Sequence, residues 1–131
     1  MIRGALLGFG FIAATTPAFA VEFEPAPGGY IEFTMPSNNV GCVYRDEEGT
    51  GLVLECDRVE PSYVRVRLFE EGLPQVHRNV GDPSCCGAEN TFEYGTSWRK
   101  GPFTCASTTS GLRCNNGDHG FRLSRSGVKT Y

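Results

Sequence analysis

Several signals that define common protein classes are missing from this sequence of 131 residues. After residue 20, apolar residues do not recur at helical spacing over the ten or so positions that a helix requires. Glycine and proline also interrupt the chain often, with 17 and 8 copies. No apolar run reaches the roughly 20 residues of a membrane-spanning helix. The sequence therefore predicts neither a helical fold nor a transmembrane segment.

Residues that carry common catalytic chemistry are also scarce. The two histidines, His77 and His119, lie near no closely spaced cysteine pair, so a zinc site is not expected. There is no glycine-rich phosphate loop, metal-protease helix motif or G-x-S-x-G elbow. The formal net charge of −3 has the wrong sign for a polyanion-binding surface. We expect no metal, no cofactor and no nucleic-acid partner.

The first twenty residues have the pattern of a cleavable secretory signal. Arg3 gives a positive start, an apolar run extends from Gly4 to Ala14, and Pro17 precedes an A-x-A site that ends at Ala20. Cleavage after Ala20 would leave residues 21–131, a length that suits one domain. We therefore expect an exported protein that is periplasmic or extracellular.

From residue 30 onward, short runs rich in valine, tyrosine, phenylalanine and leucine alternate with turn residues. The preceding segment, 21–29, contains two prolines and a Gly-Gly pair and is expected to be an extended leader. Segment 72–88 is expected to be loop with one strand near Val76. The expected strands are 30–35, 40–46, 52–57, 63–69, 91–94, 102–107, 112–115 and 121–124. About seven or eight short strands predict a single all-β domain over 30–131, an antiparallel sandwich, barrel or meander.

The strand expected at 63–69 separates its side chains by type. Val64, Val66 and Leu68 share one face, which we expect to be buried. Arg65 and Arg67 share the other face, which we expect to be in solvent. Such a face can bind an anion or a partner, but alternating arginines more often supply solubility and protect a sheet edge.

Six cysteines, an even number, are expected to form three disulfides in an exported protein. Cys42 and Cys56 occupy the two arms of one expected hairpin, and Cys105 and Cys114 the arms of another. Each pair would face across neighbouring strands, so we predict both pairings.

Cys85 and Cys86 leave more than one interpretation open. They form a bridge between sequence neighbours, remain as exposed thiols, or each reach a different strand. A strained bridge is easily reduced, so a redox role is an alternative. A staple within a loop is the favoured interpretation.

A hydrolytic site can be sketched from His119, Asp118 and Ser124. Triads are seldom built from sequence neighbours, because the three groups must meet in space with separate roles. The favoured interpretation is that residues 116–120 form a tight turn.

The aromatic residues of YGTSW suggest a binding surface. Tyr94 and Trp98, together with Asp118 and His119, are the candidate contacts for a protein, peptide or glycan partner. A lone tryptophan is more often the centre of a core, and that interpretation is favoured for Trp98.

Five motifs, FTMPSNNVGC, YGTSW, GPFTC, GLRC and HGFRLSR, together with ECD at Cys56, resemble a family of small bacterial exported proteins of unknown function. That family shares a PSGN-x-x-C opening and a YG-x-x-W, F-x-C, G-L-x-C, GHGF-x-LSR ending. The resemblance covers Phe33 to Arg125. Asn38 replaces a glycine that is usual in the family, and the adjacent Cys85 and Cys86 replace separated middle cysteines. The resemblance implies a secreted, cysteine-paired β domain and transfers no catalytic residue.

These observations together predict a non-enzymatic binding or envelope-associated protein. One alternative is a small secreted hydrolase or inhibitor that uses His119. The other is a redox-active protein that uses Cys85 and Cys86. The sequence predicts neither the ligand nor the oligomeric state.

Overall fold

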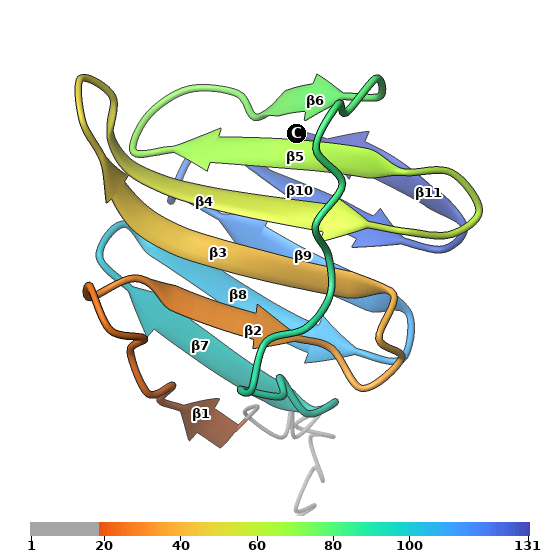
Figure 1. Cartoon of the computed structure of the whole chain (residues 1–131), viewed down its shortest axis with the longest axis horizontal. Helices are drawn as coiled ribbons and strands as arrows, with labels where there is room; N and C mark the ends of the chain where they lie inside the picture. The colour runs from red at the N-terminus through yellow and green to blue at the C-terminus, as the bar shows by residue number, and fades with distance from the viewer. Residues whose placement is uncertain (1–18) are drawn as a thin grey trace, which may run out of the picture.

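The structure, a computed structural model, describes residues 19–131. Nearly all of the expected secretory signal therefore lies outside the described residues. Within residues 19–131 the chain forms eleven strands and no helix. Two sheets face each other as a sandwich (Figure 1). The expected all-β class is confirmed, and a sandwich is the architecture adopted.

The front sheet in Figure 1 is an antiparallel meander in chain order. Glu48 and Gly49 belong to the tight turn between its second and third strands, and Gly49 has a φ of 81°, which glycine adopts without strain. The strands are β2 (Ile31–Thr34), β3 (Val40–Glu47), β4 (Gly51–Arg58), β5 (Val64–Phe69) and β6 (Gln75–His77). The hairpin expected from 40–46 and 52–57, and the strand near Val76, are confirmed.

The back sheet has the order β1-β7-β8-β9-β10-β11. Its strands are β1 (Phe19–Val21), β7 (Thr96–Lys100), β8 (Phe103–Thr108), β9 (Gly111–Asn115), β10 (Gly120–Ser124) and β11 (Gly127–Thr130). All its pairs are antiparallel except β1 with β7, which run parallel with Val21 opposite Trp98.

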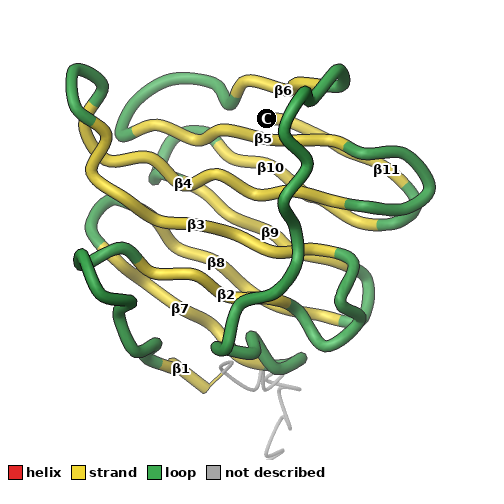
Figure 2. Tube along the Cα trace, in the orientation of Figure 1, coloured by secondary structure: helices red, strands yellow, loops and turns green. Residues whose placement is uncertain are grey.

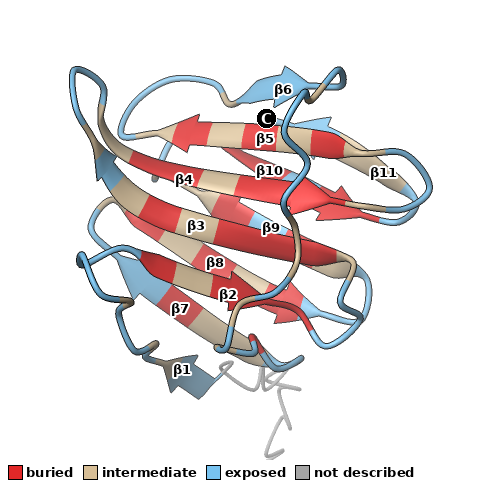
Figure 3. Cartoon of the chain, viewed as in Figure 1, coloured by how far each residue is buried: buried red, intermediate tan, exposed pale blue. Residues whose placement is uncertain are grey.

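Alternate residues of both sheets fill the space between them. On β5, Val64, Val66 and Leu68 are each 0% exposed, which confirms the expected aliphatic face, and Figure 3 shows the alternation along this strand. An aromatic cluster closes one side of the core, where the ring of Phe33 lies 5.0 Å from that of Phe92. The core is thus continuous between the two sheets.

Two disulfides cross-link neighbouring strands inside this core. Cys42 faces Cys56 across β3 and β4, and Cys105 faces Cys114 across β8 and β9, each pair with Cα atoms 4.1 Å apart. All four residues are at most 3% exposed. Both predicted pairings are confirmed, and the third disulfide joins Cys85 to Cys86.

One expected strand is absent and three strands of the structure were not expected. Residues 91–94 do not form a strand, because only Thr91 pairs, in a single bridge to Thr34. The strand lies just after them, at β7, over residues for which no strand was expected. Strands β1 and β11 were also missed, so the expected number of strands was too low.

The segment expected to be an extended leader is docked on the sandwich. Val21 and Phe23 pack against the core, and the ring of Phe23 stacks 4.9 Å from that of Phe33. The apolar side chains of 21–29 therefore contribute to the folded domain.

The arginine face of β5 is not in solvent, contrary to expectation. The side chains of Arg65 and Arg67 are 13% and 21% exposed, and each lies opposite an acidic residue of β4 in register, Asp57 and Glu55. The acidic partners neutralise the two arginines, so this face does not offer free positive charge to an anion.

Candidate functional site

A long connection crosses the outer surface of the front sheet, and we call its residues 82–90 the strap. Figures 1 and 2 show it as a loop that leaves the region of β6 and passes over the sheet toward β2. Residues 82–90 show no strand periodicity, and the structure assigns no strand to them. Hydrogen bonds at both ends hold it against the sheet.

The first anchor of the strap lies beside β5. The backbone N–H groups of Ser84 and Cys85 both donate to the hydroxyl of Tyr63, each at 3.1 Å. Asp82 accepts a bond from Nη1 of Arg65 at 2.9 Å. Two neighbouring side chains of the sheet therefore fix the start of the strap.

Asp57 lies beneath this anchor and holds both of those side chains. It accepts two bonds from Arg65, at 2.9 and 3.0 Å, and a further bond from the hydroxyl of Tyr63. The hydrogen bond to Asp57 raises the pKa of Arg65 above its usual value. Burial, and then the bond to Asp57, raises the pKa of the Tyr63 phenol. Arg65 thus stays charged and Tyr63 stays protonated at neutral pH.

The second anchor lies at β2. The hydroxyl of Thr34 accepts a bond from the Ala88 N–H at 3.3 Å, and the Thr34 N–H donates to the carbonyl of Asn90 at 2.9 Å. The side-chain amide of Asn90 donates to the carbonyl of Glu32 at 2.9 Å. The strap is therefore tied to strands on both sides of β3.

Between the anchors, the Cys85–Cys86 disulfide lies directly over Gly41 of β3. A Cβ atom at Gly41 would be 3.1 Å from both sulfur atoms and 3.2 Å from the carbonyl oxygen of Phe33. These distances are tighter than most real Cβ contacts, so a larger residue at position 41 would push the strap outward by a few tenths of an ångström. The loop-staple interpretation of these cysteines agrees with this position.

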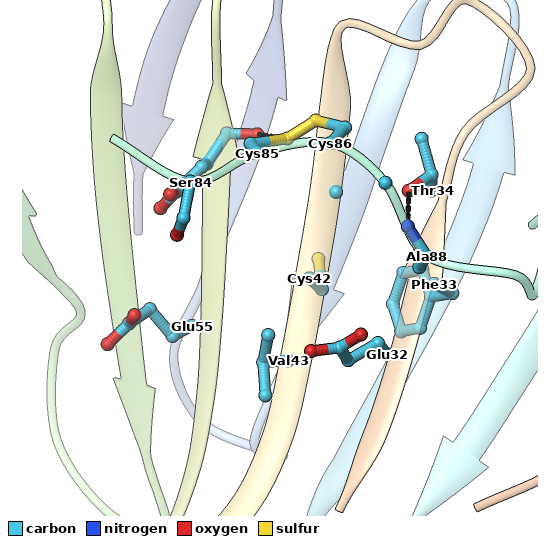
Figure 4. Close-up of a pocket in the computed structure, with 13 residues that line it drawn as sticks. Glu32, Phe33, Thr34, Cys42, Val43, Glu55, Ser84, Cys85, Cys86 and Ala88 are labelled. Carbon is cyan, nitrogen blue, oxygen red and sulfur yellow. Dashed lines mark hydrogen bonds between the residues drawn. A yellow bond between two sulfur atoms is a disulfide. The ribbon is translucent and has the colours of Figure 1, made fainter. Parts of the chain in front are cut away.

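The strap and the sheet enclose a pocket of about 270 Å³, which we call the strap pocket. Figure 4 shows the disulfide on one side of it and the side chains of the sheet on the other. Its walls are Cys85, Cys86 and Ala88 from the strap and Glu32, Val43 and Glu55 from the sheet.

The two glutamates of the strap pocket differ in their partners. The carboxylate of Glu55 lies 3.1 Å from Arg45 and 3.1 Å from Arg67, so its charge is compensated. The half-buried carboxylate of Glu32 has no ion pair or hydrogen bond to another described residue. The pocket therefore has a mixed lining, in which Val43, Ala88 and the disulfide lie near one uncompensated negative charge.

The four residues expected to form a binding surface do not meet. Trp98 is 2% exposed and packs against the rings of Phe33 and Tyr44, at 5.2 and 5.9 Å, so it belongs to the core. Tyr94 is 39% exposed. His119 lies in the turn before β10, whereas Tyr94 lines a groove with the residues after β10. Tyr94 and the turn of His119 thus lie at opposite ends of the sandwich.

The sketched triad is not assembled either. Ser124 is five residues from His119 along extended strand β10, a separation of about 16 Å. Asp118 is exposed, and Nδ1 of His119 is buried without a hydrogen-bond partner among the described residues. The backbone N–H of His119 donates to the side chain of Asn116 at 2.9 Å, as in a capped turn.

Sequence reasoning missed Glu32 and Gly41, because their role depends on a strap that the sequence does not position. Charge alternation on 52–57, with Glu55 and Asp57 on one face, was a usable signal for the pairing with the arginines of β5.

Within residues 19–131 no group of three or more histidine, cysteine, aspartate or glutamate side chains is arranged to hold a metal ion. A search of the same residues for a helix long and apolar enough to cross a membrane finds none. Comparison with known proteins finds no matching protein-family model, curated protein or solved structure. A function for this chain is therefore argued from its own residues.

Proposed function

We propose that this protein is an exported, non-enzymatic binding domain whose ligand site is the strap pocket. The observation that carries the proposal is the Glu32 carboxylate, which has no partner among the described residues and lines a pocket together with the apolar groups of Val43, Ala88 and the disulfide. An unpaired charge beside apolar surface favours a ligand that brings both the opposite charge and a short apolar stem. The ligand is therefore a small cationic group, such as a primary ammonium on an alkyl chain.

Three further features support this proposal. The N-terminal pattern and the three disulfides fit a protein that reaches an oxidising compartment. The strap is fixed at both ends, so the pocket is preformed, and less ordering is needed on binding. A volume of about 270 Å³ admits one side chain or one small amine rather than a polymer.

Butylammonium is a suitable probe, because butanol has a similar shape and no charge. We expect butylammonium to shift the amide resonances of Gly41, Val43 and Gly87 in an NMR titration of the full chain, and butanol to leave them unchanged. Glu32→Gln should weaken binding about fivefold or more, since a partly exposed ion pair is worth about 1 kcal/mol. Nα-acetyl-lysine amide, which keeps the side-chain ammonium, is titrated in parallel. Its affinity relative to that of butylammonium distinguishes a peptide side chain from a free amine.

The matched control is Glu93→Gln, which removes one exposed negative charge outside the strap pocket. If Glu93→Gln lowers the affinity as much as Glu32→Gln, the effect is a general charge effect and the proposed site is wrong. Equal shifts with butanol and butylammonium would also contradict it.

A second candidate function is thiol–disulfide exchange at Cys85–Cys86. The observation that favours it is exposure, because both residues are half-buried whereas the other four cysteines are at most 3% exposed. Exposed disulfides are the ones that exchange readily. A dithiol would give two electrons and two protons to Cys85 and Cys86, which become thiols, and would itself become a disulfide.

Selective reduction tests this second function. In mild dithiothreitol without denaturant, we expect two thiols per chain to appear first, and peptide mapping after alkylation should place them at Cys85 and Cys86. Removal of the reductant under oxidising conditions should restore the bridge. Simultaneous opening of Cys42–Cys56 or Cys105–Cys114 would exclude a dedicated exchange site.

A further inference from the structure

A second and larger groove lies at the end of the sandwich where Tyr94 is found, and we call it the end groove. Its volume is about 730 Å³, within the range of small-molecule sites. The chain brings four turns together here, 36–39, 59–60, 108–111 and 124–126, with Tyr94 beside them. It shares no lining residue with the strap pocket.

The turns of the end groove are held by their own hydrogen bonds. The side chain of Asn39 donates to the carbonyl of Glu60 at 3.0 Å and accepts from the Glu60 N–H at 2.7 Å, which ties two turns together. The hydroxyl of Thr108 bonds to the carbonyl of Gly111 at 3.2 Å. The groove is therefore preorganised by side chains that form hydrogen bonds within the protein.

Other polar side chains of the end groove are free to contact a ligand. Those of Asn38, Thr109, Ser110 and Arg125 make no hydrogen bond to another described residue. Asn38 also has a φ of 58°, the left-handed conformation that residues other than glycine seldom adopt. Asparagine adopts this conformation more readily than most residues, so it suits the turn at 36–39.

Tyr94 adds an exposed aromatic face to these polar groups. The residue is 39% exposed. Of the other apolar residues that line the groove, Met35 and Val40 are each 3% exposed and Val59 is half-buried. The accessible surface thus combines the aromatic residue Tyr94 and the half-buried Val59 with hydroxyl and amide groups.

The charges of the end groove balance each other. Glu60 and Arg125 are the charged residues in its lining, one of each sign, so the groove attracts neither a polyanion nor a polycation. Hydroxyl and amide groups both donate and accept, as sugar hydroxyls do. An aromatic ring supplies a flat apolar surface for the C–H face of a sugar ring.

We propose that the end groove binds a neutral oligosaccharide, with Tyr94 stacked on one sugar ring and Asn38 and Arg125 bonded to its hydroxyls. This site is separate from the strap pocket, so the two proposals stand or fall independently.

The test titrates the full chain with maltohexaose, cellohexaose and chitohexaose, each followed by NMR. We expect at least one of them to bind with a dissociation constant in the millimolar range or below and to shift the amides of Asn38, Ser110 and Ser126. Tyr94→Ala should weaken that binding about tenfold, and Tyr94→Phe should retain it, because stacking needs the ring and not the hydroxyl.

Two further variants keep the result interpretable. Asn38→Gly preserves the left-handed backbone and removes only the amide, so it should fold normally and lose affinity severalfold. Tyr131→Ala removes a ring that is 44% exposed, outside the end groove, and should bind as the wild type does. Failure of all three oligosaccharides to bind, or equal losses in Tyr94→Ala and Tyr131→Ala, would overturn the proposal.

Discussion

Replacing Cys42 and Cys56 together by alanine is expected to lower the free energy of unfolding by about 3 kcal/mol. The bridge joins residues 14 positions apart, and in the chain-entropy model its loss frees that loop in the unfolded state. A whole domain is typically stable by only about 5 to 15 kcal/mol, so the loss is a large fraction. Equilibrium unfolding in urea measures this loss of stability, which should lower the midpoint of the transition and leave its slope unchanged.

The protein contains its own control for this experiment. Cys85 and Cys86 are adjacent, so their bridge closes no loop in the unfolded chain. Its removal should therefore lower the free energy of unfolding only slightly. Replacing Cys105 and Cys114, which are 9 positions apart, should cost slightly less than replacing the first pair. If Cys85→Ala with Cys86→Ala destabilises the fold as much as Cys42→Ala with Cys56→Ala, loop entropy is not the source of the stability.

Replacing Arg65 by methionine is expected to cost about 3 kcal/mol, which is the lower end of the range for breaking a buried ion pair. Arg65 is 13% exposed and Asp57 is 9% exposed, and removing one partner leaves the other as a poorly solvated charge. The strap should also loosen, because Arg65 holds Asp82. Urea unfolding gives the stability, and amide hydrogen exchange at Ser84 and Cys85 reports on the strap.

A double-variant cycle distinguishes this cause from lost packing. Asp57→Asn combined with Arg65→Met removes both charges, so the double variant should recover part of the stability lost by Arg65→Met alone. Arg67→Met is the matched comparison, since Arg67 is more exposed, at 21%, and it should lose less. If Arg65→Met lowers the free energy of unfolding by less than about 0.5 kcal/mol, the Arg65–Asp57 pair contributes no more than an ordinary surface ion pair.

Much of the fold was predictable from local patterns. Alternation on 63–69 identified the buried face of β5, and the arms of two hairpins identified the partners of Cys42 and Cys105. These features depend on residues close in sequence, where strand period and turn chemistry decide the outcome. Short strands were less visible, as the edge strand β11 has four residues and little alternation, and the inner strand β7 buries only Trp98 deeply.

The candidate site was not predictable in the same way. The strap has no periodicity of its own, and its path is set by distant partners such as Tyr63 and Thr34. Tyr94 was identified by its type, but its neighbours were not, because the end groove forms only when four turns from different hairpins meet. Sequence reasoning grouped Tyr94 with His119, which the sandwich places at the other end.

The parallel pair of β1 and β7 bears on the order in which the protein acquires structure. Val21 pairs with Trp98, and Thr34 pairs with Thr91, so both pairings join residues that are far apart in the sequence. The β3–β4 and β8–β9 hairpins can form early, but the side of the sandwich that holds Phe23 must close late. We therefore expect the chain to fold on the millisecond-to-second timescale of β proteins rich in distant contacts, more slowly than a helical bundle of equal length.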